Sequence, residues 1–245
     1  MLHRALEKPK SILCYQKMRL KGCVYVLITM LIILLWCFTV KWSKQQEAAK
    51  RSYEMNGFVT DCDNPGLFKA HLNCCPLKHC PVNYFPFHLY SGVADVVAAK
   101  ICFNNTVIMG GIRDNAGPGL NIVIANGGTG EVLRNDYFNV KSKDPEELHA
   151  YLKTLKPGNI VLVASHIDPT PQLTDEIREI FTALGSTMVT SLKPRDSWVF
   201  AGTFGIKEAR PFEKLIQNDV GRNAYGDWPE SGEVIGCLPR ITETE

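Results

Sequence analysis

The sequence has little net charge and no concentration of charge of one sign. It holds 27 lysines and arginines against 25 acidic residues, which leaves a net charge of +2 at pH 7. The basic residues are scattered, whereas a protein that binds nucleic acid gathers them on one face to neutralise phosphates. The composition therefore predicts that nucleic acid is not a partner.

The sequence also lacks the motifs of common hydrolases and nucleotide-binding enzymes. It has no nucleophile elbow, no metalloprotease helix with two histidines, no paired acids in a polar loop and no P-loop lysine. The glycines of Gly117-Pro118-Gly119 precede a predicted strand, whereas a dinucleotide fingerprint follows a strand and opens a helix. We expect a tight turn there, and we expect neither a cofactor nor catalysis.

What the sequence does contain is one long hydrophobic run near its start. Residues 23–40 carry no charge, and about 20 helical residues span the roughly 30 Å core of a bilayer. The charged residues ahead of the run are basic apart from Glu7, which favours a cytoplasmic N-terminus. A core helix of a soluble protein would need a polar face, which this run lacks.

This run divides the chain into four parts. We expect a cytoplasmic or n-region at 1–22, a signal anchor or signal peptide at 23–40, a stem at 41–72 and a folded domain at 73–240. Whether the run is cleaved stays open, but no clear small-x-small site follows Val40, which favours an uncleaved or late-cleaved signal anchor. The folded domain would enter the secretory pathway, and the protein would be either secreted or held in a membrane through residues 23–40.

Most of the nine cysteines follow the hydrophobic run: Cys62, Cys74, Cys75, Cys80, Cys102 and Cys237. Thiols in an oxidising lumen become disulfides, so this even number predicts a disulfide framework whose pairing the spacing leaves open. The cluster from Cys74 to Cys80 could instead hold zinc, but a structural zinc site usually draws on a second paired cluster, which is missing. We expect no metal.

The sequon Asn104-Asn105-Thr106 makes Asn104 a candidate N-glycosylation site. Such a site is used only in the secretory lumen. It is therefore consistent with the topology that the hydrophobic run predicts.

Strand-like and helix-like stretches alternate after Cys80. Strands are expected at 104–109, 120–125, 131–140, 159–165 and 197–202, and helices at 144–156, 175–184 and 211–217. The glycines of Asn126-Gly127-Gly128-Thr129-Gly130 predict a hairpin turn between two of these strands. The stretch 222–228 is polar and irregular, so Cys237 is expected to pin the tail to the domain.

Two clusters of polar residues could form a site. His166 and Asp168 follow an apolar strand, where an acid/base pair is conceivable, but no nucleophile stands beside them and we expect a loop-lining or capping role. Arg195-Asp196-Ser197-Trp198 could grip sugar hydroxyls, with the aromatic ring stacking on the sugar. The alternative, which the residues alone favour, is an internal Arg–Asp ion pair with Trp198 in the core.

Several segments, in this order, resemble the interleukin-like EMT inducer and pancreatic-derived factor family of cytokine-like secreted proteins. They are Cys80-Pro81-Val82-Asn83-Tyr84-Phe85, Ser91-Gly92-Val93-Ala94-Asp95-Val96-Val97, Gly119-Leu120-Asn121-Ile122, Asn126-Gly127-Gly128-Thr129-Gly130, Leu184-Gly185-Ser186, Arg195-Asp196-Ser197-Trp198-Val199-Phe200 and Gly226-Asp227-Trp228-Pro229. The resemblance covers about Cys74 to Cys237.

The resemblance implies an α+β fold of two packed antiparallel β-sheets flanked by short helices and bridged by disulfides. It implies the pairs Cys74–Cys102 and Cys80–Cys237, with Cys62 and Cys75 left over. One relative dimerises through an additional cysteine, and this chain has Ala201 at the matching position.

The family domain is also similar to a GG-type lectin domain, whose sugar is held by two arginines and an aspartate. Only one of these positions is retained, as Arg195, while the others are Pro118 and Ile167, with Asp168 one residue later. The resemblance makes Arg195, Asp168 and Asp196 the candidate carbohydrate-binding residues. It implies a secreted or shed signalling ligand for a cell-surface receptor, and the alternative is a Golgi-resident, membrane-anchored glycan-binding module.

Overall fold

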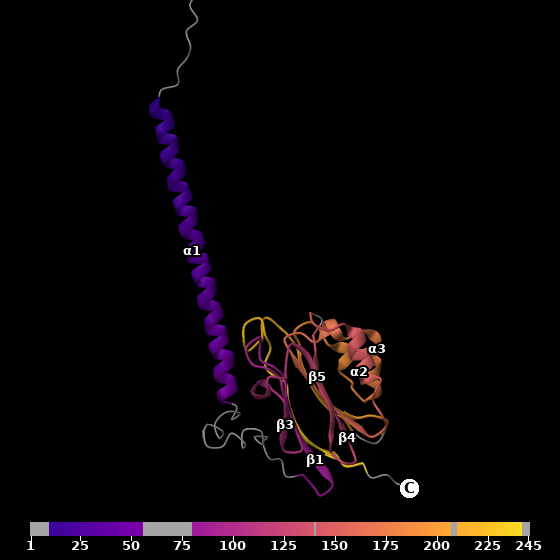
Figure 1. Ribbon diagram of the computed structural model, residues 1–245. Helices are drawn as coiled ribbons and strands as arrows, with labels where there is room; N and C mark the ends of the chain where they lie inside the picture. Colours follow the sequence, from indigo (N-terminus) through magenta and orange to yellow (C-terminus); the bar gives the residue numbers. More distant parts are fainter. Residues whose placement is uncertain (1–9, 56–79, 140, 207–209, 242–245) are drawn as a thin grey trace, which may run out of the picture. The chain divides into compact units, whose positions relative to one another are not determined.

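The computed structural model describes residues 10–55, 80–139, 141–206 and 210–241 (Figure 1). The chain divides into two compact units, residues 1–45 and 46–245. The predicted α+β fold is confirmed. It has two antiparallel sheets with short helices and a disulfide, and an apolar helix precedes it.

The N-terminal part of the chain forms one long helix, α1 (Lys10–Met55). Its stretch Val24–Lys44 is 21 residues long, with a mean hydropathy of 2.3 and no buried share. At about 1.5 Å per residue this stretch reaches across the roughly 30 Å core of a bilayer. A signal sequence near the N-terminus can also meet these criteria of length and apolar composition, so the helix fits either an anchor or a signal peptide. Part of the predicted stem, 41–55, is helical, and 56–72 lies outside the described residues.

The first sheet of the folded domain has four antiparallel strands in the order β3-β2-β1-β9. They are β1 (Tyr84–Tyr90), β2 (Lys100–Phe103), β3 (Thr106–Met109) and β9 (Glu233–Pro239). The last strand of the chain therefore pairs with the first, along the whole of β1. The first and last strands of the folded domain are therefore neighbours in one sheet.

The second sheet has five antiparallel strands in the order β5-β4-β6-β7-β8. They are β4 (Gly119–Asn126), β5 (Val132–Phe138), β6 (Asn159–His166), β7 (Ser197–Thr203) and β8 (Phe212–Ile216). The α-helices α2 (Pro145–Leu152) and α3 (Asp175–Ala183) connect its strands, together with the 3-10 turns η3 (Thr170–Gln172) and η4 (Val189–Ser191). A further turn, η2 (Gly111–Arg113), precedes the sheet.

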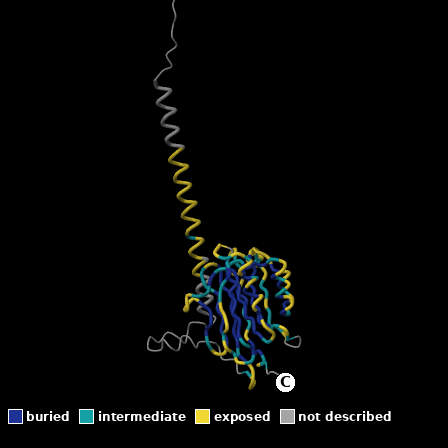
Figure 2. Tube along the Cα trace, turned by 45° about the vertical axis from the view of Figure 1, so that its right-hand side comes forward, coloured by how far each residue is buried: buried dark blue, intermediate teal, exposed yellow. Residues whose placement is uncertain are grey.

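The central strands of the five-stranded sheet, β4, β6 and β7, are buried on both faces. The helices lie on one side of this sheet and the four-stranded sheet on the other (Figures 1 and 2). Ile122 and Ile124 of β4 belong to the same core cluster as the helix residue Ile177, whereas Val123 between them belongs to a second cluster with Leu89 of β1. Side chains alternate across a strand, so a strand covered on both faces must be apolar throughout. This explains the uninterrupted apolar runs of β4 and β6.

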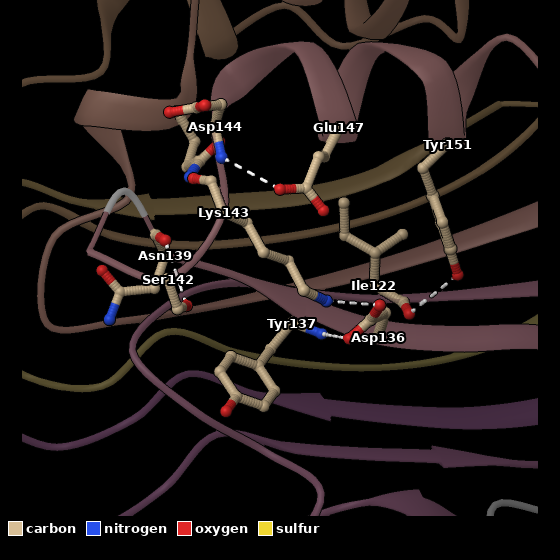
Figure 3. A network of polar contacts seen from close by, with 10 residues as sticks. Ile122, Asp136, Tyr137, Asn139, Ser142, Lys143, Asp144, Glu147 and Tyr151 are labelled. Carbon is tan, nitrogen blue, oxygen red and sulfur yellow. Dashed lines mark hydrogen bonds and ion pairs between the residues drawn. The ribbon is translucent and has the colours of Figure 1, made fainter.

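The start of α2 is tied to the sheet by a polar network (Figure 3). The backbone N–H of Asp144 donates to the Glu147 carboxylate, at 3.3 Å. The Lys143 ammonium lies 2.5 Å from the Asp136 carboxylate of β5 and 4.8 Å from the Phe138 ring centroid. The charges of Lys143 and Asp136 therefore pair with each other, and this network has a structural role.

The predicted disulfide between Cys80 and Cys237 is confirmed, with the two sulfurs 2.05 Å apart. It joins the residues just before β1 to β9, as expected for a bridge that pins the tail. Cys102 is also disulfide-bonded. Cys62, Cys74 and Cys75 lie outside the described residues, and so the pairing of Cys74 with Cys102 stays a prediction.

One predicted element is wrong: residues 211–217 do not form a helix, because 212–216 is strand β8. It pairs antiparallel with β7, and the Phe212 ring packs edge-on against Phe87 at 5.1 Å between centroids. Glu213 accepts a hydrogen bond from the Trp198 indole N–H at 2.8 Å. These long-range contacts override a local sequence that favours a helix, since propensity is a weak preference.

Candidate functional site

A small pocket lies where β6 ends and β7 begins. Its walls come from four parts of the chain: the residues after β1, the end of β6, the start of β7 and the loop before β9. They include Gly92, His166, Ile167, Arg195, Asp196 and Trp228. The cavity between these walls is small, with a volume of about 10 Å³, which is room for about one water molecule.

Three residues of the pocket walls have an unusual backbone. Ala94, Ile167 and Arg195 adopt left-handed conformations, with φ of 49°, 65° and 65°. Every other non-glycine residue with positive φ in the described chain is an asparagine or aspartate, types that tolerate this region. A left-handed conformation costs other residues about 1–3 kcal/mol each, and such strain clusters at functional sites. The backbone therefore marks this pocket as the candidate site.

Arg195 is held by an aromatic ring. Its guanidinium carbon lies 5.0 Å from the ring centroid of Trp228, in a cation–π contact. Among the described residues, the guanidinium has no ion pair and donates no hydrogen bond of normal geometry. Arg195 is exposed at the pocket rim, so its N–H donors are available to a ligand.

Asp196 also lines the pocket but uses its carboxylate to hold the loops. One oxygen accepts from the backbone N–H of Lys193 at 2.8 Å, and the other from that of Asn218 at 2.7 Å. Asp196 is only 2% exposed. Asp196 thus fixes the loop, as the structural alternative predicted, but through backbone amides and not through an ion pair with Arg195.

The aromatic partner of Arg195 is not the one that the sequence placed beside it. Trp198 is fully buried, packs against Phe181 at 5.3 Å between ring centroids and donates its indole N–H to Glu213. The expectation that Trp198 lies in the core agrees with this position. Trp228, far along the sequence, takes the place at the pocket, and only its presence in a family segment singled it out beforehand.

His166 forms a buried wall of the pocket. The residue is 7% exposed, and neither ring nitrogen has a hydrogen-bond partner of normal geometry in the described chain. Burial lowers the pKa of His166 below its usual value of 6.5, and the nearby backbone of Gly117 and Ala94 and the Asp95 carboxylate oppose this only in part. The imidazole is therefore neutral at pH 7.

Asp168 does not join His166 in the pocket. Its carboxylate accepts from the backbone N–H and the hydroxyl of Thr170, at 2.9 and 2.7 Å, and so caps the turn η3. Of the candidate carbohydrate-binding residues, Arg195 and Asp196 line the pocket and Asp168 does not. Ile167 also lines it, at a position where the resembling lectin has an aspartate. Sugar binding by these residues stays a prediction.

Two further predictions concern single sites. Asn104 and Asn105 occupy the tip of the β2–β3 hairpin with φ of 49° and 64°, and both are exposed. Within the described ranges, no group of three or more histidine, cysteine or acidic side chains could hold a metal ion. Glycosylation of Asn104 remains untested.

Comparison with known proteins covers most of the chain. The interleukin-like EMT inducer family model matches residues 118–206, which include His166 and Arg195. The chain is 43% identical to human protein FAM3C over 167 residues, which are 68% of this chain and 74% of that protein. It is 36% identical to mouse protein FAM3D over 225 residues, or 91% of this chain and 99% of the relative. Mouse protein FAM3A is 39% identical over 161 residues, or 66% and 70%. The chain therefore belongs to the interleukin-like EMT inducer family.

Proposed function

We propose that this protein is a secreted or shed signalling ligand that acts through a cell-surface receptor and does not catalyse a reaction. Membership of a cytokine-like family is the observation that carries the proposal. A hydrophobic helix near the N-terminus supports delivery to the secretory pathway, and a disulfide supports an oxidising environment for the folded domain.

The residues of the pocket also fit binding better than catalysis. The carboxylates of Asp168 and Asp196 accept hydrogen bonds from neighbouring groups, and His166 has no nucleophile hydrogen-bonded to it within the described chain. A catalytic base needs a group from which it takes a proton at hydrogen-bond distance, or through one water. The pocket instead presents donors and an aromatic ring.

The test starts with the full chain expressed in a secretory cell line. The mass of the protein in the medium gives its N-terminus, and the purified, labelled form is then added to responsive cells. We expect saturable surface binding that excess unlabelled protein displaces, followed by a signalling response. Complete retention in the producing cells, or absence of both binding and response, would contradict the proposal.

A second candidate function is that of a Golgi-resident glycan-binding module whose apolar helix is never cleaved. The unpaired guanidinium of Arg195 beside Trp228 favours it, because this pair is a means of holding a polar ligand against an aromatic ring. Removal of surface proteins with protease and of surface glycans with glycosidases separates the two functions. Binding that survives protease treatment but not glycan removal supports the lectin function.

A further inference from the structure

Two loops beside the pocket are joined into one surface. Loop 193–196 directly precedes β7, and loop 217–223 directly follows β8. The backbone N–H of Asn218 donates to the Asp196 carboxylate at 2.7 Å, and its side-chain amide donates to the Pro194 carbonyl at 3.3 Å. These bonds hold the second loop against the first, and we call the two segments together the loop pair.

Each loop of the pair is also stabilised by its own polar groups. In the first, the Lys193 N–H donates to the Asp196 carboxylate at 2.8 Å, and the Asp196 N–H donates to the Lys193 carbonyl at 3.1 Å. In the second, the Asp219 carboxylate accepts from the Gly221 N–H at 2.9 Å, and the Asp219 carbonyl accepts from the Asn223 N–H at 2.7 Å. The surface is therefore ordered before a partner arrives, and an ordered surface loses less entropy on binding.

Val220 is an apolar side chain at the tip of the second loop. It is 75% exposed, although the hydrogen bond from Gly221 to Asp219 spans it and fixes the backbone there. Apolar surface gains free energy only when it leaves water, and Val220 leaves water only when another molecule covers it. A single exposed valine is ordinary by itself. Its place on an ordered loop that is held against Arg195's loop distinguishes this one.

Arg195 lies on the first loop with its guanidinium open to a partner. The guanidinium carbon is 5.0 Å from the Trp228 ring centroid, and within the described residues the side chain has no ion pair. The neighbouring Asp196 carboxylate is buried and accepts two backbone hydrogen bonds. A guanidinium presents two N–H donors that match the two oxygens of a carboxylate. The chemistry of this side chain therefore fits a carboxylate of another molecule.

We propose that the loop pair is the surface through which this protein contacts its receptor, with Val220 entering an apolar site and Arg195 pairing with a receptor carboxylate. The inference rests on the proposed function as a signalling ligand, and it adds the face of the ligand and the chemistry of the partner. Arginine and tryptophan are enriched among the residues that dominate the affinity of protein interfaces, and such residues lie beside contacts that exclude water. Arg195 stacked on Trp228, with Val220 on the adjoining loop, has this composition.

A glycan is a less suitable partner for the loop pair. The cavity beside Arg195 has a volume of about 10 Å³, so a sugar ring cannot enter it. The side chain of Val220 has no hydrogen-bonding group for sugar hydroxyls, whereas it fits an apolar site on a protein. The exposed valine therefore favours a protein as the partner of this surface.

The test measures the binding of labelled full-length protein to responsive cells. Val220→Asp and Arg195→Gln change the loop pair. Leu133→Asp and Arg134→Gln are the matched controls on β5, because Leu133 is 45% exposed and Arg134 also stacks on an aromatic ring, that of Tyr151, at 4.5 Å. We expect each loop-pair variant to bind at least ~10-fold more weakly than the parent protein, with an unchanged unfolding midpoint, and each control to bind like the parent.

Three results would overturn the inference: unchanged affinity of either loop-pair variant, an equal loss of affinity in its control, and parent binding that survives protease treatment of the cells. If Arg195→Gln lowers the unfolding midpoint, Val220→Asp decides, since its side chain is exposed to solvent. Unchanged affinity of the variants would leave the proposed function in place, because the protein would still bind and signal. A parent protein that neither binds nor signals would contradict the proposed function, and this inference with it.

Discussion

At the scale of single residues, the pocket depends on a close contact between Gly92 and His166. A Cβ atom at Gly92 would lie 2.1 Å from His166 Cδ2, far inside van der Waals contact. We expect Gly92→Ala to lower the free energy of unfolding by about 1–3 kcal/mol, since overpacking forces side chains to shift. Chemical denaturation measures this. In a His166→Ala background the same change should cost less, and equal costs in both backgrounds would contradict the contact.

His166 also makes stability depend on pH. Its pKa in the folded protein is lowered by burial, so around and below pH 6.5 the unfolded chain binds a proton more readily than the folded one. The stabilisation is complete above the unfolded pKa of about 6.5 and is lost as the pH falls below it. We expect the free energy of unfolding to fall between pH 7.5 and 5.5, and to fall less steeply in His166→Gln.

Urea denaturation at several pH values checks this prediction. Part of the pH dependence of stability should remain in His166→Gln because of His88. Burial also lowers the pKa of His88, despite its hydrogen bond to Glu233. An identical slope in the parent protein and in His166→Gln would show that His166 does not contribute.

An N-linked glycan on Asn104 would report that the folded domain enters the secretory lumen. Its exposed place at a hairpin tip leaves the side chain open to the glycosylation machinery. We expect the protein from a secretory cell line to lose mass on treatment with an N-glycosidase, and Asn104→Gln to remove this shift. Asn105→Gln is the matched control because it keeps the sequon, and it should retain the shift.

At the scale of elements, β8 depends on Glu213. This carboxylate accepts from the Trp198 indole, from the hydroxyl of Ser186 and from the backbone N–H groups of Thr187 and Met188. It therefore joins the edge strand to β7 and to the turn η4. The number of its partners explains why a glutamate occupies an edge strand beside a buried tryptophan.

We expect Glu213→Ala to cost about 1–3 kcal/mol of stability, because the buried Trp198 N–H loses its acceptor. Glu213→Gln retains one acceptor oxygen and should cost less. Equilibrium unfolding followed by tryptophan fluorescence measures both variants. Equal stability of Glu213→Ala and the parent protein would mean that the network contributes nothing.

The element scale also shows where local patterns suffice. The glycine-rich turn, the capped start of α2 and the apolar strand β6 were predicted nearly to the residue, because each depends on neighbours in sequence. The helix α2 itself ends at Leu152, four residues before its predicted end. The strands β1, β2 and β9 were not predicted. Tyr84–Tyr90 contains a proline and β9 contains a glycine, so neither has a simple alternating pattern, and their partners lie far along the chain.

At the scale of the whole molecule, the disulfide between Cys80 and Cys237 closes the domain. The two cysteines are 157 residues apart, so the bond removes much of the freedom of the unfolded chain. We expect the double variant Cys80→Ser, Cys237→Ser to lose about 2–5 kcal/mol of stability. Thermal and chemical unfolding measure the loss. Cys37→Ser, which changes a free cysteine of α1, is the control and should leave the folded domain unchanged.

The sequence by itself determined the apolar helix, the strands with long apolar runs, the helix starts and the family, because these follow from local composition or from ordered segments. Only the tertiary structure decided that 212–216 is a strand, that β9 pairs with β1, and that Trp228, not Trp198, meets Arg195. It also brought the left-handed Ala94, Ile167 and Arg195 to one pocket. The physical reason is that these contacts join residues far apart in the chain, whose pairing depends on the packing of both sheets.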